Sequence, residues 1–192
     1  MEMSRHQLTR EDWTNAALKA LAEGGVSAVR VDALARGLGM TRGSFYWHFK
    51  DRDALVVAAL EEWERRTTET IVQLGLIPDP AERLRMLLSQ ALQEDALSRL
   101  EPAIVAHASD PVVSSVLHRV TERRVEFIAE AYGQLGHPAS AARREALIAY
   151  AAYMGWLHLR SAAHEVLPEL ADPGEAGVAA RNHLANRLIG ND

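Results

Sequence analysis

The 192-residue chain contains no cysteine. This absence excludes a disulfide framework, thiolate catalysis and cysteine-ligated zinc or iron–sulfur sites. Long apolar runs are also missing, because the longest uncharged stretch, residues 146–159, is shorter than the roughly 18 apolar residues that a membrane span needs. The first residues, MEMSRHQLTRED, contain no apolar segment of the kind found in signal peptides. We therefore expect a soluble, cytoplasmic protein that does not enter a membrane.

Signals for β-strands are scarce as well, since β-branched runs are short and no Asn-Gly or Asp-Gly hairpin turn occurs. Helix signals recur instead. Thr9 and Asp12 have the spacing of a capping pair, and Trp13 begins a series of apolar residues at helical spacing that Gly24-Gly25 should end. Asp-Pro pairs are typical of helix starts, because Asp caps free N–H groups and Pro fits the first helical position. Such pairs begin at residues 79, 110 and 172, and Glu101-Pro102 is a weaker version.

These signals predict an all-α protein of about nine helices. The segment 75–80 is the best candidate for a break in the chain. The division is then an N-terminal module over 1–50, a connecting helix over 51–74 and a larger helical domain over 75–192. The expected helices are 9–23, 31–38, 42–48, 52–74, 80–97, 102–108, 111–134, 139–165 and 173–189.

Charge is distributed unevenly along the chain. The net charge of −5 argues at first against nucleic acid as a partner. Residues 1–50, however, contain seven Lys and Arg against five Asp and Glu, a net charge of +2, and His6 and His48 could add to it. Residues 51–192 carry −7. The N-terminal module is therefore the part of the chain in which to look for an anionic partner.

Residues 30–49 carry the most informative pattern. Apolar residues at helical spacing mark two short helices, and Gly39-Met40 forms a tight turn between them, with Met40 pointing inward. Thr41 is expected to cap the second helix. Two short helices joined by a glycine-containing turn are the signature of a helix-turn-helix motif. In that motif the N-terminal residues of the second helix enter the DNA major groove.

The exposed residues of this segment have chemistry that suits DNA. Arg42 can donate two hydrogen bonds to guanine, and Gly43 lets the backbone approach the groove. Lys50 and Arg52 lie at the start of the next helix, where N–H groups attract phosphate, although both could be ordinary solvated charges. Trp47 could equally pack on a neighbouring helix. The expected DNA contacts are Arg30, Thr41, Arg42, Gly43, Ser44, Tyr46, Trp47, His48, Lys50 and Arg52.

Over residues 9–60 the chain resembles the TetR/AcrR family of bacterial transcriptional repressors. The resemblance rests on Ala33-Leu34-Ala35, on the string LGMTRGSFYWHFK over 38–50 and on the following DRDAL. Family members are all-helical homodimers with a three-helix DNA-binding module, so the resemblance implies a dimer that binds a pseudo-palindromic operator and that a small-molecule effector releases. It implies no enzyme activity, cofactor or metal. The family often has Lys where this chain has Arg52. The matching positions imply DNA contacts from Thr41, Arg42, Gly43, Ser44, Tyr46 and His48.

The C-terminal two thirds should provide the dimer interface. The helix over 139–165 is apolar on most of its surface, so it must be buried on several sides. In the resembled family the last two long helices of each subunit form the interface. Small residues on this helix would let a second helix approach closely, although the same residues could instead complete a monomer core. The expected interface residues are Ala151, Ala152, Gly155, Leu184 and Leu188.

The resemblance also implies an effector pocket among the middle helices. The helix over 52–74 joins both parts and is expected to transmit effector binding to the DNA-binding module. A lone histidine on an apolar face, such as His107, is more often a core or edge residue than a ligand contact. Residues that mix apolar walls with polar tips could line the pocket: Met86, Gln90, His107, His118, Phe127, Tyr132 and Trp156.

Two other functions stay open at this point. His118, Glu122 and Glu126 lie four residues apart in turn, which could place an imidazole and two carboxylates on one helix face for catalysis. The sequence has no HExxH, P-loop, GxGxxG or GxSxG motif, and such pairs are more often surface ion pairs. Alternatively, the same fold could serve an activator, or a protein that organises DNA rather than repressing a gene.

Overall fold

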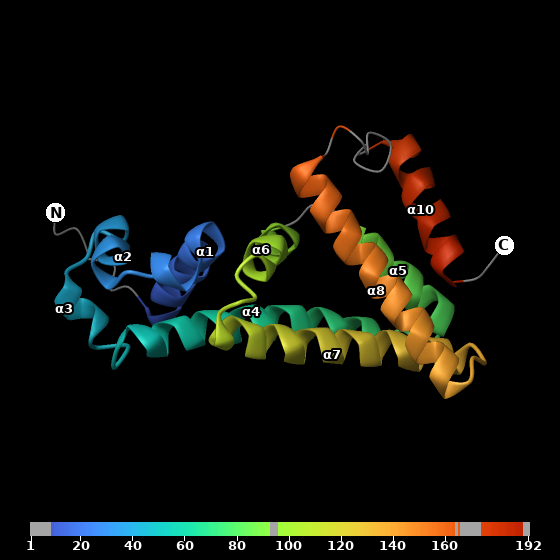
Figure 1. The fold of residues 1–192 in the computed structure, drawn as a ribbon, viewed down its shortest axis with the longest axis horizontal. Helices are drawn as coiled ribbons and strands as arrows, with labels where there is room; N and C mark the ends of the chain where they lie inside the picture. Colours follow the sequence, from blue (N-terminus) through green and yellow to red (C-terminus); the bar gives the residue numbers. More distant parts are fainter. Residues whose placement is uncertain (1–8, 93–95, 164, 166–173, 190–192) are drawn as a thin grey trace, which may run out of the picture. The chain divides into compact units, whose positions relative to one another are not determined.

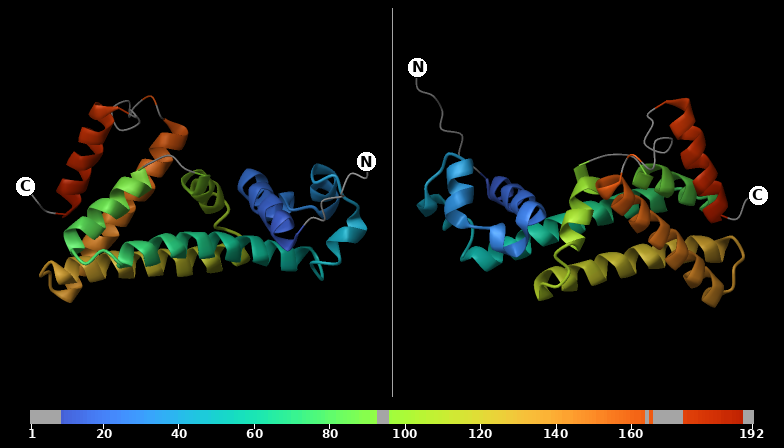
Figure 2. Two further views of the ribbon diagram at one scale, coloured as in Figure 1. Left: turned by 180° about the vertical axis from the view of Figure 1, so that it is seen from behind. Right: turned by 45° about the horizontal axis from the view of Figure 1, so that its top comes forward.

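The computed structural model describes residues 9–92, 96–163, 165 and 174–189. These residues form nine helices and no strand, which confirms the all-α prediction (Figure 1, Figure 2). None of the described helices combines the length and apolar character needed to cross a lipid bilayer. The predicted start at Asp172-Pro173 lies outside the described residues. The helices are α1 (Arg10–Ala28), α2 (Val31–Gly37), α3 (Arg42–Phe45), α4 (Arg52–Gly75), α5 (Pro80–Leu92), α6 (Ala96–Val105), α7 (Pro111–Gln134), α8 (Ala139–Ala162) and α10 (Glu175–Ile189).

Side-chain caps begin several helices, at Thr9 and at the first two Asp-Pro pairs as the sequence predicts. Thr9 and Asp12 form a capping box, in which the Asp12 N–H donates to Thr9 Oγ1 (3.3 Å) and the Thr9 N–H donates to Asp12 Oδ2 (2.7 Å). Asp79 and Asp110 each accept a hydrogen bond from the N–H two residues further on, at 3.0 and 2.9 Å. Asp51 accepts one from the N–H three residues further on (2.8 Å), at the start of α4. These carboxylates satisfy N–H groups that have no partner inside the helix.

The glycine pair ends the regular helical geometry of the first part of α1, as the sequence predicts, and a short further turn of helix follows it. Gly24 (φ −154°, ψ 23°) and Gly25 (φ 69°) leave helical geometry, and α1 then continues to Ala28. A Cβ at Gly25 would lie 2.8 Å from Nδ1 of His107. Glycine is therefore required at position 25 both by the left-handed φ and by the close approach of the imidazole ring.

The helix start predicted at Pro102 is wrong. Pro102 lies inside α6, which begins at Ala96. Glu101 does not act as a cap, because its buried carboxylate accepts a hydrogen bond from Arg124 instead. Proline has no N–H to donate to the carbonyl four residues earlier, and α6 ends three residues after it, at Val105.

Packing divides the chain into two compact units. The N-terminal unit consists of Met1–Arg66 with Ala103–Leu117, and the C-terminal unit of Thr67–Pro102 with His118–Asp192. The first half of α4 thus belongs to the N-terminal unit and its second half to the C-terminal unit. The sequence suggested a separate connecting helix over 51–74, whereas the structure shares this helix between the two units.

The N-terminal unit is built around aromatic rings. Trp13 of α1 meets Phe45 of α3 edge-on, with ring centroids 5.4 Å apart, and Phe45 stacks on Phe49 at 5.7 Å. Leu55 and Trp63 of α4 are fully buried in the same unit. Because each aromatic side chain buries a large apolar area, these rings hold α1 and α3 together and contribute much of the core of the N-terminal unit.

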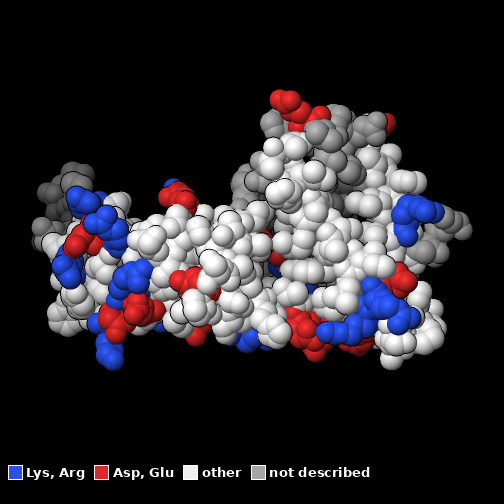
Figure 3. Space-filling view, in the orientation of Figure 1, with Lys and Arg blue, Asp and Glu red and all other residues white. Residues whose placement is uncertain are grey.

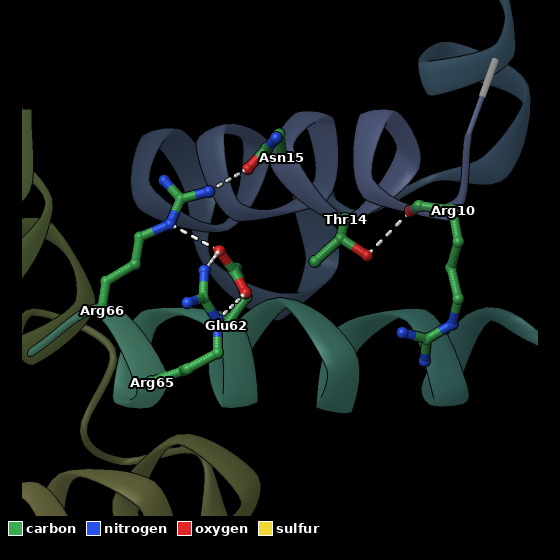
Figure 4. A network of polar contacts seen from close by, with 6 residues as sticks. All are labelled: Arg10, Thr14, Asn15, Glu62, Arg65 and Arg66. Atoms are coloured by element: carbon green, nitrogen blue, oxygen red, sulfur yellow. Dashed lines mark hydrogen bonds and ion pairs between the residues drawn. The ribbon is translucent and has the colours of Figure 1, made fainter. Parts of the chain in front are cut away.

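Polar contacts join α1 to the first half of α4 (Figure 4). Glu62 accepts hydrogen bonds from Nε of Arg65 (2.8 Å) and from Nε of Arg66 (2.6 Å), and Arg66 also donates to Asn15 on α1. The hydrogen bond from Arg65, together with the contacts to Arg66, lowers the pKa of Glu62 to about 2. Glu62 is therefore charged at neutral pH and anchors two arginines beside α1.

The C-terminal unit packs α5, α7, α8 and α10 around an aliphatic core, and α5 contacts both α8 and α10 (Figure 1, Figure 2). The buried guanidinium of Arg83 donates to the carbonyl of Ile77 (3.0 and 2.9 Å) and to Gln134 (3.2 Å), which ties the start of α5 to the end of α7. The Tyr132 hydroxyl donates to the carbonyl of Leu188 on α10. The core residues are Leu84, Val125, Ile128, Ala131, Tyr132, Ala142, Ala146, Ala149 and Ile189.

Candidate nucleic-acid interface and ligand cavity

The helix-turn-helix is formed by α2 and α3. Gly39 has φ 67°, a left-handed conformation that glycine adopts without strain, and the Met40 N–H donates to the Ala35 carbonyl (2.8 Å) to close the turn. The second helix is shorter than the predicted 42–48, because it ends at Phe45 and continues as a turn. Thr41 occupies the N-cap position without a side-chain cap bond. The Ser44 hydroxyl donates to the Thr41 carbonyl instead (2.8 Å).

Arg42 is held on the surface of this motif by two partners. Its Nη2 donates to the Tyr46 hydroxyl (3.3 Å), and its Nη1 lies 3.7 Å from a carboxylate oxygen of Asp32 on α2. The hydrogen bond with Tyr46, and then the attraction to Asp32, raises the pKa of Arg42. The guanidinium is therefore held in one position by these partners but remains exposed to solvent.

Two large aromatic side chains lie beside Arg42 in solvent. Trp47 is 88% exposed and Tyr46 is 53% exposed, although Phe45 and Phe49 on either side of them are buried. Trp47 therefore does not pack on a neighbouring helix, which was the alternative interpretation of its sequence position. Ser44 and His48 are half-buried. The other exposed members of the expected DNA-contact set are Arg30, Thr41, Arg42, Gly43 and Lys50.

Basic side chains gather over the end of the N-terminal unit that carries α2 and α3, with acidic ones among them (Figure 3). Arg52 does not join this exposed group. Its Nε donates to the Val29 carbonyl (2.8 Å), its Nη2 to the Val26 carbonyl, and its Nη1 pairs with Asp53 (3.0 Å). Arg52 thus ties the end of α1 to the start of α4, and no local spacing in the sequence signals that contact.

A cavity of ≈ 220 Å³ lies inside the C-terminal unit. Two of the seven residues predicted for a pocket, Gln90 and Phe127, line it. The complete lining comes from the second half of α4 and from α5, α6, α7 and α8: Thr67, Thr70, Ile71, Leu87, Leu88, Gln90, Ala91, Glu101, Arg124, Phe127, Ile128, Ala149, Tyr150 and Tyr153.

The other five residues predicted for the pocket lie elsewhere. Met86 and His118 are exposed on α5 and α7, and His107 packs against Gly25 in the N-terminal unit. Tyr132 belongs to the aliphatic core, and Trp156 is buried in a small cluster with its neighbour on α8.

A buried ion pair in the cavity wall escaped the sequence reasoning. Arg124 donates to one carboxylate oxygen of Glu101, and the Tyr153 hydroxyl donates to the other (2.9 Å). The Arg124 guanidinium also lies 5.8 Å from the centroid of the Tyr153 ring. The side chain of Glu101 is 3% exposed and that of Arg124 is 15% exposed. No spacing along the chain links these residues, which come from three different helices.

Burial and pairing act together on these groups. Burial alone would lower the pKa of Arg124, but attraction to Glu101 and the hydrogen bond with it raise the pKa further above its ordinary value. Burial, followed by the charge of Glu101, raises the pKa of the Tyr153 hydroxyl. At neutral pH the Arg124 guanidinium therefore stays charged, and the Tyr153 phenol keeps its proton.

Comparison with known proteins identifies the N-terminal module. Residues 14–59 match the family model for bacterial regulatory proteins of the tetR family. The N-terminal module is therefore that of the tetR family of bacterial regulatory proteins. This confirms the resemblance found in the sequence. The HTH-type transcriptional regulator AcrR of Shigella flexneri is 29% identical over 124 residues, which are 62% of this chain and 58% of AcrR. The chain thus spans little more than half the length of that TetR-family relative.

Solved structures extend the likeness in fold over the whole chain. A transcriptional regulator from Rhodococcus sp. Rha1 has a TM-score of 0.74 and 19% identity, with 95% of each chain covered. FadR from Bacillus subtilis, determined in complex with stearoyl-CoA, has a TM-score of 0.67 and 14% identity over 96% of this chain and 100% of FadR. Both likenesses show that the chain shares the fold of these regulators, an N-terminal helix-turn-helix followed by a helical bundle.

The predicted dimer residues fall into two groups. Ala151 and Gly155 are exposed on α8, and Ala152 is half-buried. Leu184 and Leu188 are half-buried on α10. Leu184 packs against Trp156 and Leu157 of the same chain, so it completes the subunit's own core. The exposed group continues along α8 with Leu147 (47% exposed), Ile148 (56%) and Leu159 (39%).

The residues that suggested catalysis lie on the surface of the C-terminal unit. Glu122 pairs with Arg143 on α8 (3.0 Å), and the two side chains are 41% and 49% exposed. His118 and Glu126 are exposed on α7. The relatives found by comparison are transcriptional regulators, so the comparisons give the catalytic alternative no support. In the described part of the chain no three His, Asp or Glu side chains are grouped as a metal site.

Proposed function

We propose that this TetR-family protein is a cytoplasmic transcriptional repressor that binds a pseudo-palindromic DNA operator as a homodimer and is released by a small-molecule effector. One observation carries the proposal. Arg42, Tyr46 and Trp47 stand exposed on a module whose neighbouring rings, Phe45 and Phe49, are buried. A soluble protein rarely leaves a tryptophan 88% exposed unless a partner covers it.

The exposed residues differ in chemistry and therefore suit different parts of the DNA. Arg42 suits the bidentate pair with guanine O6 and N7 in the major groove. Arg30 and Lys50 suit phosphate, which fixes the register of the protein on the duplex but reads no sequence. Gly43 presents no side chain, so the backbone can come close to the groove. The polar edges of Tyr46 and Trp47 suit the sugar-phosphate backbone.

Effector release has a physical route through α4. The first half of this helix belongs to the N-terminal unit, and Thr67, Thr70 and Ile71 in its second half line the cavity. A ligand that binds better to one arrangement of this wall shifts the equilibrium between arrangements of α4. A coupling free energy of about 1–3 kcal/mol, or about 5–150-fold in DNA affinity, is sufficient.

Dimerisation is supported by the exposed stripe on α8. Leu147, Ile148, Ala151, Gly155 and Leu159 recur at helical spacing and are all exposed in the single chain. The small residues in the middle of the stripe allow two such helices to approach closely. A two-fold dimer would place two recognition helices about one DNA turn, roughly 34–36 Å, apart, which is the spacing of operator half-sites.

DNA recognition is tested by selecting sequences from a random duplex pool and measuring affinity for the selected site at several salt concentrations. Arg42→Ala should lose sequence preference, with a cost of about 1–3 kcal/mol on the selected site. Lys50→Ala should weaken binding to all DNA sequences by a similar factor. It should also reduce the slope of log affinity against log salt concentration by about one. Lys19→Ala makes the same charge change at an exposed site on α1 and serves as the control. The groove assignment fails if Arg42→Ala binds like the parent.

Dimerisation is tested by sedimentation at matched protein concentrations. Gly155→Glu places a charge in the middle of the stripe and should convert the dimer to a monomer with weakened operator binding. Gly133→Glu makes the same change at another exposed helical glycine with open space around it and should leave the dimer intact. A Gly155→Glu protein that stays dimeric would place the interface elsewhere. Transcript levels in a deletion strain separate a repressor from an activator.

A further inference from the structure

The two charged residues of the cavity wall cancel each other. Glu101 and Arg124 are the acidic and basic residues among the described lining, and every other lining residue is uncharged. Taking the cavity as the effector site of the proposed function, we propose that it accepts an uncharged, largely apolar ligand that presents one hydrogen-bond-accepting oxygen to Arg124. The chemistry is that of a small ketone, ester or amide with an aromatic or aliphatic body.

Charge balance excludes ligands of either sign. A cationic ligand beside Glu101 would add a second positive charge to the wall, and an anionic ligand at the remaining donors of Arg124 would add a second negative charge. In both cases the wall would bury one charge without a partner, which is strongly unfavourable in a low-dielectric site. A neutral ligand leaves the pair intact.

The wall nevertheless has hydrogen-bond donors to offer. A guanidinium carries five N–H donors, and among the described residues Arg124 donates one hydrogen bond, to Glu101. Both oxygens of Glu101 already accept a bond, one from Arg124 and one from Tyr153. The Tyr150 hydroxyl is engaged with Thr121 (3.2 Å). The carboxylate has about two lone-pair sites left, whereas the guanidinium has about four N–H donors left. The surplus is therefore on the donor side, and an acceptor oxygen on the ligand satisfies it.

Size and lining describe the rest of the ligand. A dry apolar cavity of about 150 Å³ holds a benzene molecule, so ≈ 220 Å³ suits a ring with a short chain. Ile71, Leu87 and Ile128 supply aliphatic walls, and Phe127 and Tyr150 supply aromatic ones. A body of this kind gains its affinity from apolar contact, whereas the oxygen fixes its orientation.

The test is a series of four compounds that share one branched skeleton of non-hydrogen atoms and differ only in the atoms at its end, titrated calorimetrically into the full chain without DNA. They are 4-phenylbutan-2-one (neutral acceptor), 3-phenylpropanoate (anion), 4-phenylbutan-2-amine (cation) and 3-methylbutylbenzene (apolar). The ketone should bind at least about tenfold more tightly than the other three, since a hydrogen bond to a charged donor contributes about that factor. The proposal is overturned if the carboxylate or the amine binds best, or if the ketone shows no binding.

Variants of the pair make the prediction sharper. Arg124→Met leaves Glu101 alone and should switch the preference to the amine, and Glu101→Gln should switch it to the carboxylate. If either single variant fails to fold, the double variant Glu101→Gln/Arg124→Met, which buries no charge, decides the question. It should bind the ketone and the hydrocarbon equally, and a retained preference for the ketone would refute the role of Arg124. A ketone that binds without weakening the DNA complex would refute the effector role of the cavity and leave this inference standing.

Discussion

The molecule uses the same three residue types, an arginine, an acid and a tyrosine, in two opposite settings. On the helix-turn-helix, Arg42 lies 3.7 Å from Asp32 and donates to Tyr46, and the side chains of the ion pair are 62% and 64% exposed. In the cavity wall, Arg124 and Glu101 are 15% and 3% exposed. The same residue types therefore interact with different strength in the two groups, because water screens the first group and is excluded from the second.

The difference explains what each arginine can do. Breaking the exposed pair costs little, since water hydrates both partners, so Arg42 can exchange Asp32 for a phosphate or a base. Breaking the buried pair leaves an unhydrated charge, so Arg124 keeps Glu101 and offers its remaining donors to a neutral ligand. The exposed pair of Arg42 and Asp32 is suited to exchanging partners, whereas the buried pair of Arg124 and Glu101 is suited to staying together.

The largest expected effect comes from breaking the buried group. Arg124→Met should lower the free energy of unfolding by about 3–5 kcal/mol, because it leaves the Glu101 carboxylate buried without a cation. Urea denaturation at neutral pH measures it. Arg42→Met is the matched control and should leave the urea midpoint unchanged. Glu101→Gln/Arg124→Met should recover most of the loss, and equal midpoints for Arg124→Met and Arg42→Met would contradict the comparison.

The sequence predicted the helix-turn-helix and its exposed Arg42 much better than the buried pair of Glu101 and Arg124. The turn at Gly39, the cap at Thr9 and the exposed Arg42 all follow from residues within a few positions of one another, and local backbone chemistry decides them. The partnership of Glu101 with Arg124 and Tyr153 spans 23 and 52 positions, and no local pattern contains it.

Misleading local signals account for the errors. Glu101 next to proline looked like a helix cap because capping uses the same residue types as buried ion pairs. The phosphate contact of Arg52 stays a prediction, and the structure adds hydrogen bonds to the carbonyls of Val26 and Val29 that its position in the sequence does not signal. Long polar side chains have more than one way to be satisfied, and tertiary packing chooses among them.

A glycine in the N-terminal unit extends the comparison from charge to backbone. Gly25→Ala should destabilise the protein by about 2–3 kcal/mol, since the left-handed φ of 69° disfavours a Cβ and the added atom would lie 2.8 Å from His107. Gly39 also has a positive φ, of 67°, but has open space around it, so Gly39→Ala should show the backbone penalty alone. Thermal unfolding of both variants separates the two causes, and equal losses would mean that the contact with His107 contributes nothing.

Glu62 provides a case between the two extremes, because its side chain is 14% exposed and it pairs with two arginines. Its pKa of about 2 in the folded protein lies below the ordinary value of 4.5, so its contribution to stability is complete above pH 4.5 and is lost as the pH falls toward 2. Glu62→Gln should lose about 1–2 kcal/mol at neutral pH and show a flatter stability profile below pH 4.5. Asn15→Ala removes one partner of Arg66 but keeps Glu62, so its acid profile should stay parallel to that of the parent.

The smallest effect on stability is expected at the most exposed aromatic residue, and it is the most informative for function. Trp47→Ala should leave the urea midpoint unchanged, since a side chain that is 88% exposed in the folded chain gains almost nothing from burial. Phe45→Ala, two positions away in the core, should cost about 3–5 kcal/mol. The other three tryptophans, Trp13, Trp63 and Trp156, are at most 5% exposed, so iodide should quench the fluorescence of Trp47 selectively. Selected operator DNA should protect it from iodide, and Trp47→Ala should bind that DNA more weakly. Quenching that persists in the complex would mean that the exposed ring is not part of the DNA interface, and another partner would then be needed to explain why the chain keeps a tryptophan in water.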